Sequence, residues 1–216
     1  MGRAAQRCAA RLVLFGLLSL VGACNLLTPI VFLGEHKKRV HPEFDKLPGK
    51  QVAVLVWTDA STQFDYQFAR IELATYLADK LQTELSQRDQ GTVLVDPRDV
   101  DDFLQSHPEA QVDPYQVGRQ FDADYVIFIE VLRMQIRDPD QPQFLRGRIE
   151  ASVSVHDIRT DPDLPQRYEL TPVACFYPDD QAVLHTATNS TLIREATYRK
   201  FAEVVARKFY EHLVDL

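Results

Sequence analysis

The sequence predicts an α/β fold: a mixed sheet of about five strands with helices packed on it, and a long helix at the C-terminal end. Two observations predict it. In the first half, apolar runs alternate with amphipathic helical segments, which is typical of parallel strands joined by crossovers. In the second half, two strand-like segments follow each other across a proline-rich turn, which indicates an antiparallel hairpin.

The first predicted strand is the run VAVLVW that follows Gln51. It is continuously apolar and rich in β-branched residues, so we expect it to be buried on both faces. A helix should follow over 71–85, because apolar residues recur there at helical spacing. Gly91 ends that segment, and TVLVD supplies a second short strand.

Two short helices are expected next, and each begins with an Asp-Pro pair. Asp96 and Asp113 can cap the free N–H groups of a first turn, and the proline that follows loses no helical donor there. Asp99 also favours the positive end of the first of these helices. The segment ADYVIFIEVLRMQI, which follows the second helix, is the strongest predicted strand of the chain.

The last third predicts a hairpin and a closing helix. In RGRIEASVSVHDI, apolar and polar residues alternate, so one face of this strand should be buried. The returning strand, RYELTPVACFY, contains Pro172 and should therefore lie at an edge or carry a bulge. The segment Thr191–Leu216 predicts one long amphipathic helix, with Phe209 and Leu213 among its inward residues.

The N-terminal segment has the pattern of a secretory signal. Three arginines precede the apolar run Leu12–Val21, which Gly16 and Ser19 interrupt. A membrane-spanning helix needs about 20 predominantly apolar residues, and this run is about half as long. The run is too short to serve as a comfortable anchor, although an uncleaved anchor and an ordinary signal peptide stay open as alternatives.

The small residues at the end of the run carry a resemblance. Val21-Gly22-Ala23-Cys24 resembles the lipobox of bacterial lipoproteins. The resemblance implies lipidation of the Cys24 sulfur, removal of the peptide before it and acylation of the new amino terminus. Two or three acyl chains on one residue anchor a protein stably. Asn25, a residue other than Asp after the cysteine, implies the outer membrane in the enterobacterial sorting pattern.

The expected organisation has three parts: a lipoprotein signal peptide at 1–23, a lipidated tether at 24–50 and a single α/β domain at 51–216. Removal of 1–23, which holds three arginines and no acidic residue, lowers the net charge from -7 to -10. A chain this acidic is not expected to bind nucleic acid. Cys175 is the one cysteine left unmodified, so no intramolecular disulfide is expected, and we interpret it as a small buried hydrophobe.

The domain also resembles a group of envelope proteins. The phrases KQVAVLVW, LATYLADKLQTEL, TVLVDPRDVDDFL, YQVGRQFDADYVIFIEV and GRIEASVSVHDIRTD carry the likeness, over about residues 50 to 160. They resemble the N-terminal domain of the Tol-Pal protein TolB, the curli-secretion lipoprotein CsgG and the lipoprotein activators of penicillin-binding proteins. The resemblance implies an anticodon-binding-like α/β fold and supplies no catalytic residue. No pore is expected, because the two long amphipathic hairpins per subunit of the curli lipoprotein have no counterpart here.

The chain carries no catalytic, cofactor or metal motif that we could assign. It lacks a glycine-rich phosphate loop, HExxH, GxSxG and paired cysteines, so no catalytic residue, cofactor or metal is predicted. The acidic run from Asp96 to Asp102 lacks the spacing of a calcium loop and is interpreted as a charged helix start. An enzyme acting on cell-wall material stays open as an alternative, with His156, Asp157 or Cys175 involved.

The preferred interaction site is the polar loop TDASTQFDY after the first strand. Open α/β sheets place ligands at the carboxyl ends of their strands, and the site is assigned to Trp57, Thr58, Asp59 and Phe64. An ordinary strand-to-helix connection is the alternative interpretation.

We therefore expect a noncatalytic, lipid-anchored protein of the bacterial cell envelope, held by its membrane anchor on Cys24 at the outer membrane and facing the periplasm. Its domain should bind an envelope protein partner or associate with itself. The alternatives are an envelope enzyme and a small-ligand carrier or transport accessory lipoprotein. An enclosed polar pocket favours these alternatives, whereas an exposed apolar patch favours a binding module.

Overall fold

The structure is a computed structural model that describes residues 37–137, 141–161, 164–186 and 189–215. It divides into two compact units, one spanning His41–His212 and the other combining Met1–Val40 with Leu213–Leu216. In the second of these, strands β1 (Lys37–Val40) and β8 (His212–Asp215) pair as a two-stranded sheet. The predicted signal peptide and the lipidation site Cys24 lie outside the described residues.

The unit His41–His212 contains the mixed sheet that the sequence predicts. Its main strands run in the order β3-β2-β4-β5-β6, and β7 pairs with β5. β2 is parallel to β3 and β4, whereas β4, β5 and β6 are antiparallel to one another in turn. The strand bounds are β2 (Gln51–Thr58), β3 (Val93–Leu94), β4 (Tyr125–Arg137), β5 (Phe144–Asp157), β6 (Gln166–Tyr177) and β7 (Val183–Leu184).

The helices of this unit are α3 (Ala60–Asp65), α4 (Ala69–Gln87), α5 (Pro97–Ser106), α6 (Pro114–Gln120) and α7 (Asn189–Ala206), with short 3₁₀ turns η2 (Pro108–Val112) and η3 (Arg207–Phe209). The two predicted Asp-Pro starts are confirmed. The Asp96 carboxylate accepts a hydrogen bond from the Arg98 N–H, and the Asp113 carboxylate accepts from the N–H groups of Tyr115 and Gln116.

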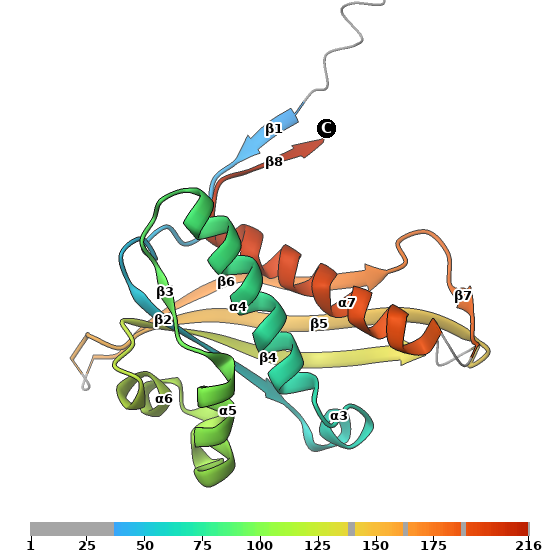
Figure 1. The fold of residues 1–216 in the computed structure, drawn as a ribbon, viewed down its shortest axis with the longest axis horizontal. Helices are drawn as coiled ribbons and strands as arrows, with labels where there is room; N and C mark the ends of the chain where they lie inside the picture. The colour runs from blue at the N-terminus through green and yellow to red at the C-terminus, as the bar shows by residue number, and fades with distance from the viewer. Residues whose placement is uncertain (1–36, 138–140, 162–163, 187–188, 216) are drawn as a thin grey trace, which may run out of the picture. The chain divides into compact units, whose positions relative to one another are not determined.

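The main core lies between one face of the sheet and helices α4 and α7, which run side by side across it (Figure 1). Val54, Ile127 and Ile129 are fully buried in this layer, and Phe201 of α7 packs against them in the same cluster. The helix approaches the sheet closely at Gly147 of β5, where a Cβ atom would lie 1.8 Å from the Thr197 hydroxyl oxygen. A glycine is therefore required there by packing.

The opposite face of the sheet is covered over only part of its area. Helices α5 and α6 bury a smaller cluster that includes Leu55 of β2 and Val126 of β4. Farther along β5, the residues on this face are polar, as in Arg148, Glu150 and Ser152, and are only partly buried. This distribution agrees with the alternation that predicted one buried face for β5.

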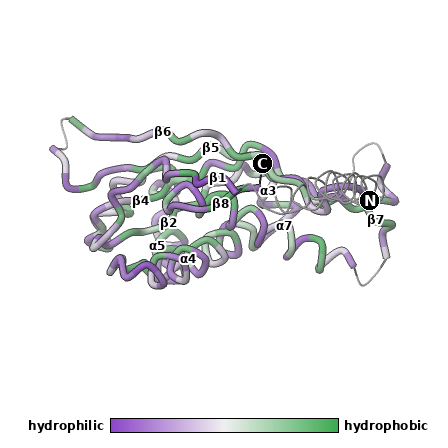
Figure 2. Tube along the Cα trace, turned by 90° about the horizontal axis from the view of Figure 1, so that it is seen from above, coloured by the Kyte–Doolittle hydropathy of each residue, from purple (hydrophilic) through white to green (hydrophobic). Residues whose placement is uncertain are grey.

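β6 is the edge strand that Pro172 predicted. The pairing of β6 with β5 shifts register between Ala151 and Val153, opposite Pro172, which marks a bulge. The Thr171 N–H at this edge donates to the Glu43 carboxylate at 2.7 Å. Figure 2 shows hydrophilic residues along the first part of β6, and charges such as Arg167 and Glu169 protect an edge from unwanted pairing.

The C-terminal helix is shorter than predicted. α7 ends at Ala206, Tyr210 has an extended backbone, and the chain finishes as β8. Phe209 is buried as expected, whereas Leu213 is exposed and not part of a helix face. Contacts with a segment near the start of the domain explain why the helix ends early. The Lys208 carbonyl accepts hydrogen bonds from the N–H groups of Glu43 and Phe44.

Residues 41–50, assigned from the sequence to a tether, pack on the domain in the structure. Phe44 and Leu47 are buried in the main core, and Phe44 makes edge-to-face contacts with Tyr125 and Tyr168. The Glu43 carboxylate accepts a hydrogen bond from the Lys208 ammonium at 2.7 Å. The prolines and charges of this segment predicted a tether, whereas Phe44 and Leu47 are spaced so that both side chains can be buried.

Candidate interaction pocket

The candidate site arises because two neighbouring strands differ in length. β2 ends at Thr58, which pairs with Val131 of β4. β4 continues to Arg137 and over this stretch pairs with β5 alone. Residues 132–137, which we call the β4 overhang, therefore form an edge within a strand whose first half is an interior strand. The chain leaving β2 turns away into α3.

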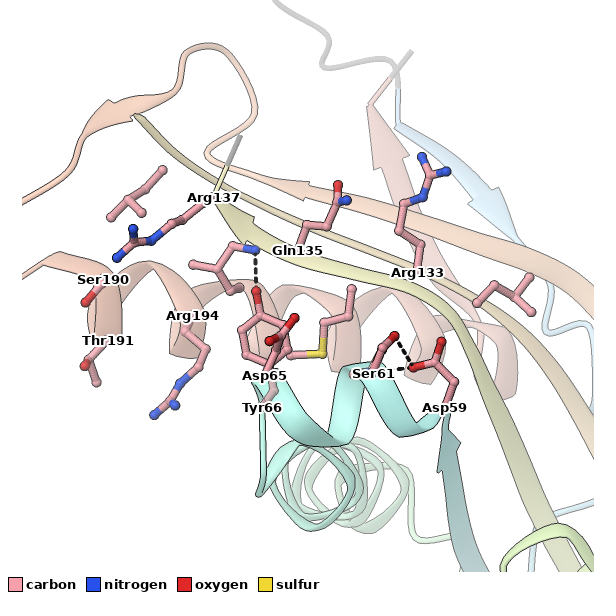
Figure 3. Close-up of a pocket in the computed structure, with 15 residues that line it drawn as sticks. Asp59, Ser61, Asp65, Tyr66, Arg133, Gln135, Arg137, Ser190, Thr191 and Arg194 are labelled. Atoms are coloured by element: carbon pink, nitrogen blue, oxygen red, sulfur yellow. Dashed lines mark hydrogen bonds between the residues drawn. The ribbon is translucent and has the colours of Figure 1, made fainter. Parts of the chain in front are cut away.

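A pocket of about 680 Å³ lies along the β4 overhang (Figure 3). This volume falls in the range of ligand-binding pockets, about 300–1,000 Å³. Four parts of the chain line it: the segment from Asp59 to Tyr66 that contains α3, the β4 overhang, Leu145 of β5 and the first two turns of α7. Its lining residues are Asp59, Ser61, Thr62, Asp65, Tyr66, Leu132, Arg133, Met134, Gln135, Ile136, Arg137, Leu145, Ser190, Thr191 and Arg194.

Local hydrogen bonds fix the wall formed by α3. The Asp59 carboxylate caps the helix by accepting from the Thr62 N–H at 2.7 Å and from the Ser61 hydroxyl at 3.1 Å. The hydrogen bond from the Thr62 N–H holds the pKa of Asp59 below its usual value. The Tyr66 hydroxyl accepts from the Ile136 N–H at 3.1 Å, and burial raises the pKa of Tyr66. Tyr66 thus ties α3 to the β4 overhang.

Three arginines supply the charge of the pocket, and each keeps hydrogen-bonding capacity. Arg133 forms no hydrogen bond or ion pair within the described part of the chain. Among the described residues, the Arg137 side chain approaches the His185 ring alone, with 3.4 Å between Nη2 and Nε2. Arg194 lies 3.8 Å from the Glu72 carboxylate, and its Nε atom is buried with no partner among the described residues. Such donors favour a ligand with carboxylate or phosphate oxygens.

Large apolar side chains are exposed at or beside the pocket. Leu132, in the pocket wall, is 61% exposed. Leu192, next to the lining residue Thr191, is 64% exposed, and Phe64, on α3, is 88% exposed. Phe68, between α3 and α4, is also exposed. Grouped exposed apolar side chains are a feature of protein-binding surfaces.

The four residues of the predicted interaction loop have different environments. Asp59 lines the pocket and Phe64 is exposed beside it. Thr58 is buried. Because successive side chains of a strand alternate, Trp57 points to the other face of the sheet from Thr58, the face that also carries Leu55. Sequence reasoning missed the three arginines. The one available signal was that the predicted strand 123–136 is much longer than the run after Gln51.

The residues considered for catalysis do not meet in this pocket or with each other. Cys175 is buried in the main core, and burial raises its pKa to about 11, so the thiol is protonated at neutral pH. His156 lies on the opposite face of the sheet, where it packs on Tyr115 and Phe128. Its Nε2 is 3.1 Å from the Ser154 hydroxyl, and burial lowers its pKa to about 4. The Asp157 carboxylate accepts from the Arg159 N–H.

Metal-binding clusters and membrane-spanning helices are absent from the described residues. Within them, no group of three or more His, Cys, Asp or Glu side chains is placed to hold a metal ion. Among the helices of the same residues, none is both long and apolar enough to cross a membrane.

Comparison with known proteins gives similarity of structure without similarity of sequence. No protein-family model matches the chain, and no curated protein matches it. The PelC dodecamer from Paraburkholderia phytofirmans aligns at TM-score 0.41 and 10% identity, covering 81% of this chain and 98% of that one. Lipoprotein GNA1162 from Neisseria meningitidis aligns at 0.37 and 14%, covering 71% and 98%. A minor lipoprotein from Acinetobacter baumannii aligns at 0.30 and 14%, covering 76% and 92%.

Bacterial lipoproteins are thus among the structural neighbours. TM-scores below 0.5 at these identities do not assign a family, a ligand or an activity.

Proposed function

We propose that this chain is a noncatalytic lipoprotein of the bacterial cell envelope whose α/β domain binds another protein at the pocket beside the β4 overhang. The observation that carries the proposal is the exposure of Leu132 in the wall of a pocket with free arginine donors, together with exposed Leu192 and Phe64 on the two helices that also line the pocket. An apolar patch with polar groups around it is the usual composition of a protein-binding surface.

The membrane address of the proposal comes from the sequence. The basic leader, the apolar run and the lipobox-like ending at Cys24 support a cleaved signal peptide and a lipid anchor. Asn25 supports the outer membrane, with the domain in the periplasm. The order of strands and helices supports an anticodon-binding-like fold, as the resemblance to the TolB and CsgG group implies.

The pocket is better suited to binding than to catalysis. Its one hydroxyl–carboxylate pair, Ser61 with Asp59, lies on an exposed helix cap, and the same carboxylate is already engaged by the Thr62 N–H. No histidine or cysteine is among the lining residues to act as base or nucleophile. A partner protein of the envelope, or a second copy of the chain, fits these features.

A second candidate function is binding of a small anion, as in an accessory protein of a transporter. Three arginines in one pocket of about 680 Å³ favour it. The large exposed apolar side chains would then have no role, so the protein-binding function is preferred.

Site-specific photo-crosslinking tests the binding function. A photoreactive phenylalanine analogue at Leu132 should give one discrete adduct in bacterial cells. The matched control is Val112 of η2, which is equally exposed at 61% and belongs to another part of the domain. Equal labelling at the two positions, or none at Leu132, would contradict the proposal.

Intact mass and detergent partitioning test the anchor. The wild-type chain should lose residues 1–23, gain acyl mass and partition with membranes, whereas Cys24→Ala should keep its leader. If Cys24→Ala changes neither processing nor partitioning, the lipoprotein assignment fails. A partner for the pocket must then be sought in another compartment.

A further inference from the structure

We propose that the pocket receives an extended acidic segment of a partner protein, which adds to the sheet as a strand along the β4 overhang. The inference rests on the proposed protein-binding function and deepens it by stating how the partner binds. Three features of the described residues support it: an unpaired strand edge, room beside that edge and an excess of positive charge.

The first feature is the strand edge. The β2 pairing of β4 stops at Val131, and residues 132–137 pair only with β5. The N–H and C=O groups of alternate residues point to opposite sides of a strand, so a set of them faces the space that β2 leaves open. One donor near this edge, the Ile136 N–H, bonds to a side chain, the Tyr66 hydroxyl, and not to another strand.

The second feature is the space itself. The pocket lies between α3 and the β4 overhang, and its lining includes residues from both. Figure 3 shows Arg133 and Gln135 pointing away from α3, so their side chains do not fill the space between the helix and the strand. An extended peptide needs such a slot to reach a strand edge.

The third feature is charge. Arg133, Arg137 and Arg194 line the pocket of a chain whose net charge is -7. Two aspartates, Asp59 and Asp65, also line it, so the five charged lining side chains carry a formal charge of three minus two, or +1. Carboxylates on a guest strand would complete the hydrogen bonding of arginines that now lack good partners.

Together these features favour a peptide over a free small anion. A small anion would use the arginines and leave both the strand edge and Leu132 unused. A guest strand of alternating acidic and apolar residues can use the arginines, the strand edge and Leu132 together. Its acidic side chains and its apolar side chains point to opposite faces of the strand. Main-chain hydrogen bonds then supply affinity, and the arginines select acidic guests.

The test uses a fluorescein-labelled octapeptide of alternating glutamate and valine, titrated into the full-length chain in detergent and followed by fluorescence anisotropy. The matched probe replaces glutamate by lysine. We expect saturable binding of the glutamate peptide and at least about tenfold weaker binding of the lysine peptide, because three arginines attract the first and repel the second. Equal binding of the two peptides, or no binding of either at millimolar concentration, overturns the inference.

A variant pair locates the binding. Arg133→Glu with Arg137→Glu should weaken the glutamate peptide about tenfold. Arg119→Glu with Arg199→Glu makes the same change of net charge at exposed positions outside the pocket, and should leave the affinity within about twofold. Equal losses in both double variants would mean that only net charge matters, which contradicts the inference.

Two further measurements separate strand addition from simple ion pairing. A glutamate-valine peptide methylated on every backbone nitrogen stays extended but cannot donate main-chain hydrogen bonds, and it should lose binding. Deuterium exchange over residues 132–137 should slow when the unmodified peptide is bound. Unchanged affinity after methylation, or slowing confined to other segments, refutes strand addition. An adduct at Leu132 in cells would in that case still support the proposed binding function, so the two failures are distinguishable.

Discussion

The two halves of β4 have opposite environments within one continuous strand. Residues 125–131 pair with β2 on one side and β5 on the other, and helices cover both faces. Residues 132–137 pair with β5 alone and border a pocket. The difference arises where β2 ends at Thr58 and turns into α3. Stability and binding can thus be assigned to adjoining stretches of the same strand.

The difference between the two halves of β4 predicts which substitutions should affect stability and which should affect binding. Side chains of the first half should contribute mainly to the free energy of unfolding, because most of them, such as Val126, Ile127 and Ile129, are fully buried. Side chains of the β4 overhang that face the pocket should contribute mainly to binding.

Ile129→Ala should lower the free energy of unfolding by about 4 kcal/mol, since Ile129 is fully buried in the main core and its removal leaves a cavity. Urea denaturation followed by circular dichroism measures it. Leu132→Ala, three residues farther along and 61% exposed, is the control and should change stability by less than about 0.5 kcal/mol. Similar losses for both variants would remove the distinction between the two halves.

His156, which pairs with Val126 in the first half, should make stability depend on pH. Burial lowers the pKa of folded His156 to about 4, below the ordinary value of 6.5. As the pH falls, the His156 imidazole therefore binds a proton in the unfolded chain before it does so in the folded chain. The contribution of neutral His156 to the free energy of unfolding is complete above pH 6.5 and is lost as the pH falls towards 4. The loss should be on the order of 3 kcal/mol.

The measurement is urea denaturation of the wild type and His156→Gln at several pH values between 7 and 4. The glutamine cannot titrate, so the difference between the two chains isolates His156 from carboxylates such as Glu43, whose pKa is also shifted. Parallel stability curves across this pH range would show that His156 titrates normally in the folded chain.

Gly147→Ala should destabilise the domain by about 2 kcal/mol, because the added Cβ would meet the Thr197 side chain of α7. Gly147 lies on β5 close to the β4 overhang, so this variant shows that the second half is tightly packed on its helix side. Thermal unfolding measures the loss, and a second change, Thr197→Ala, should restore part of it by removing the nearest atoms. A neutral Gly147→Ala would mean that α7 lies farther from the sheet.

Tyr66→Phe should cost about 1 kcal/mol, the typical value of one hydrogen bond, since the Ile136 N–H loses its partner. Deuterium exchange over residues 132–137 should become faster, while exchange over 125–131 should stay the same. Faster exchange in both stretches would indicate that Tyr66 supports the whole strand and not only the β4 overhang.

Much of the fold could be predicted from the sequence because local patterns encode it. The apolar run after Gln51 and the alternation around Val153 distinguished the parallel half from the antiparallel half. The Asp-Pro pairs placed two helix starts, and Pro172 identified the edge strand. Helix α3 was predicted as a loop, since its six residues are too few to show a helical period.

The candidate site was only partly predictable. Asp59 and Phe64 could be found from the rule that ligands bind near the ends of strands, and both lie at or beside the pocket. Arg133 and Arg137 could not, because the pocket exists through a difference in length between β2 and β4, which depends on their register. The end of α7 was missed for a similar reason: Lys208 is held by Glu43, 165 positions earlier in the chain.

The pairing of β1 with β8 holds Lys37–Val40 beside the C-terminal strand His212–Asp215. About 13 residues separate Cys24 from Lys37, and a fully extended chain spans at most about 3.5 Å per residue. In a chain anchored at Cys24, strand β1 can therefore move no more than about 45 Å from the bilayer surface. Because β8 pairs with β1, a reporter fused after the last residue would be confined to the same narrow layer next to the membrane.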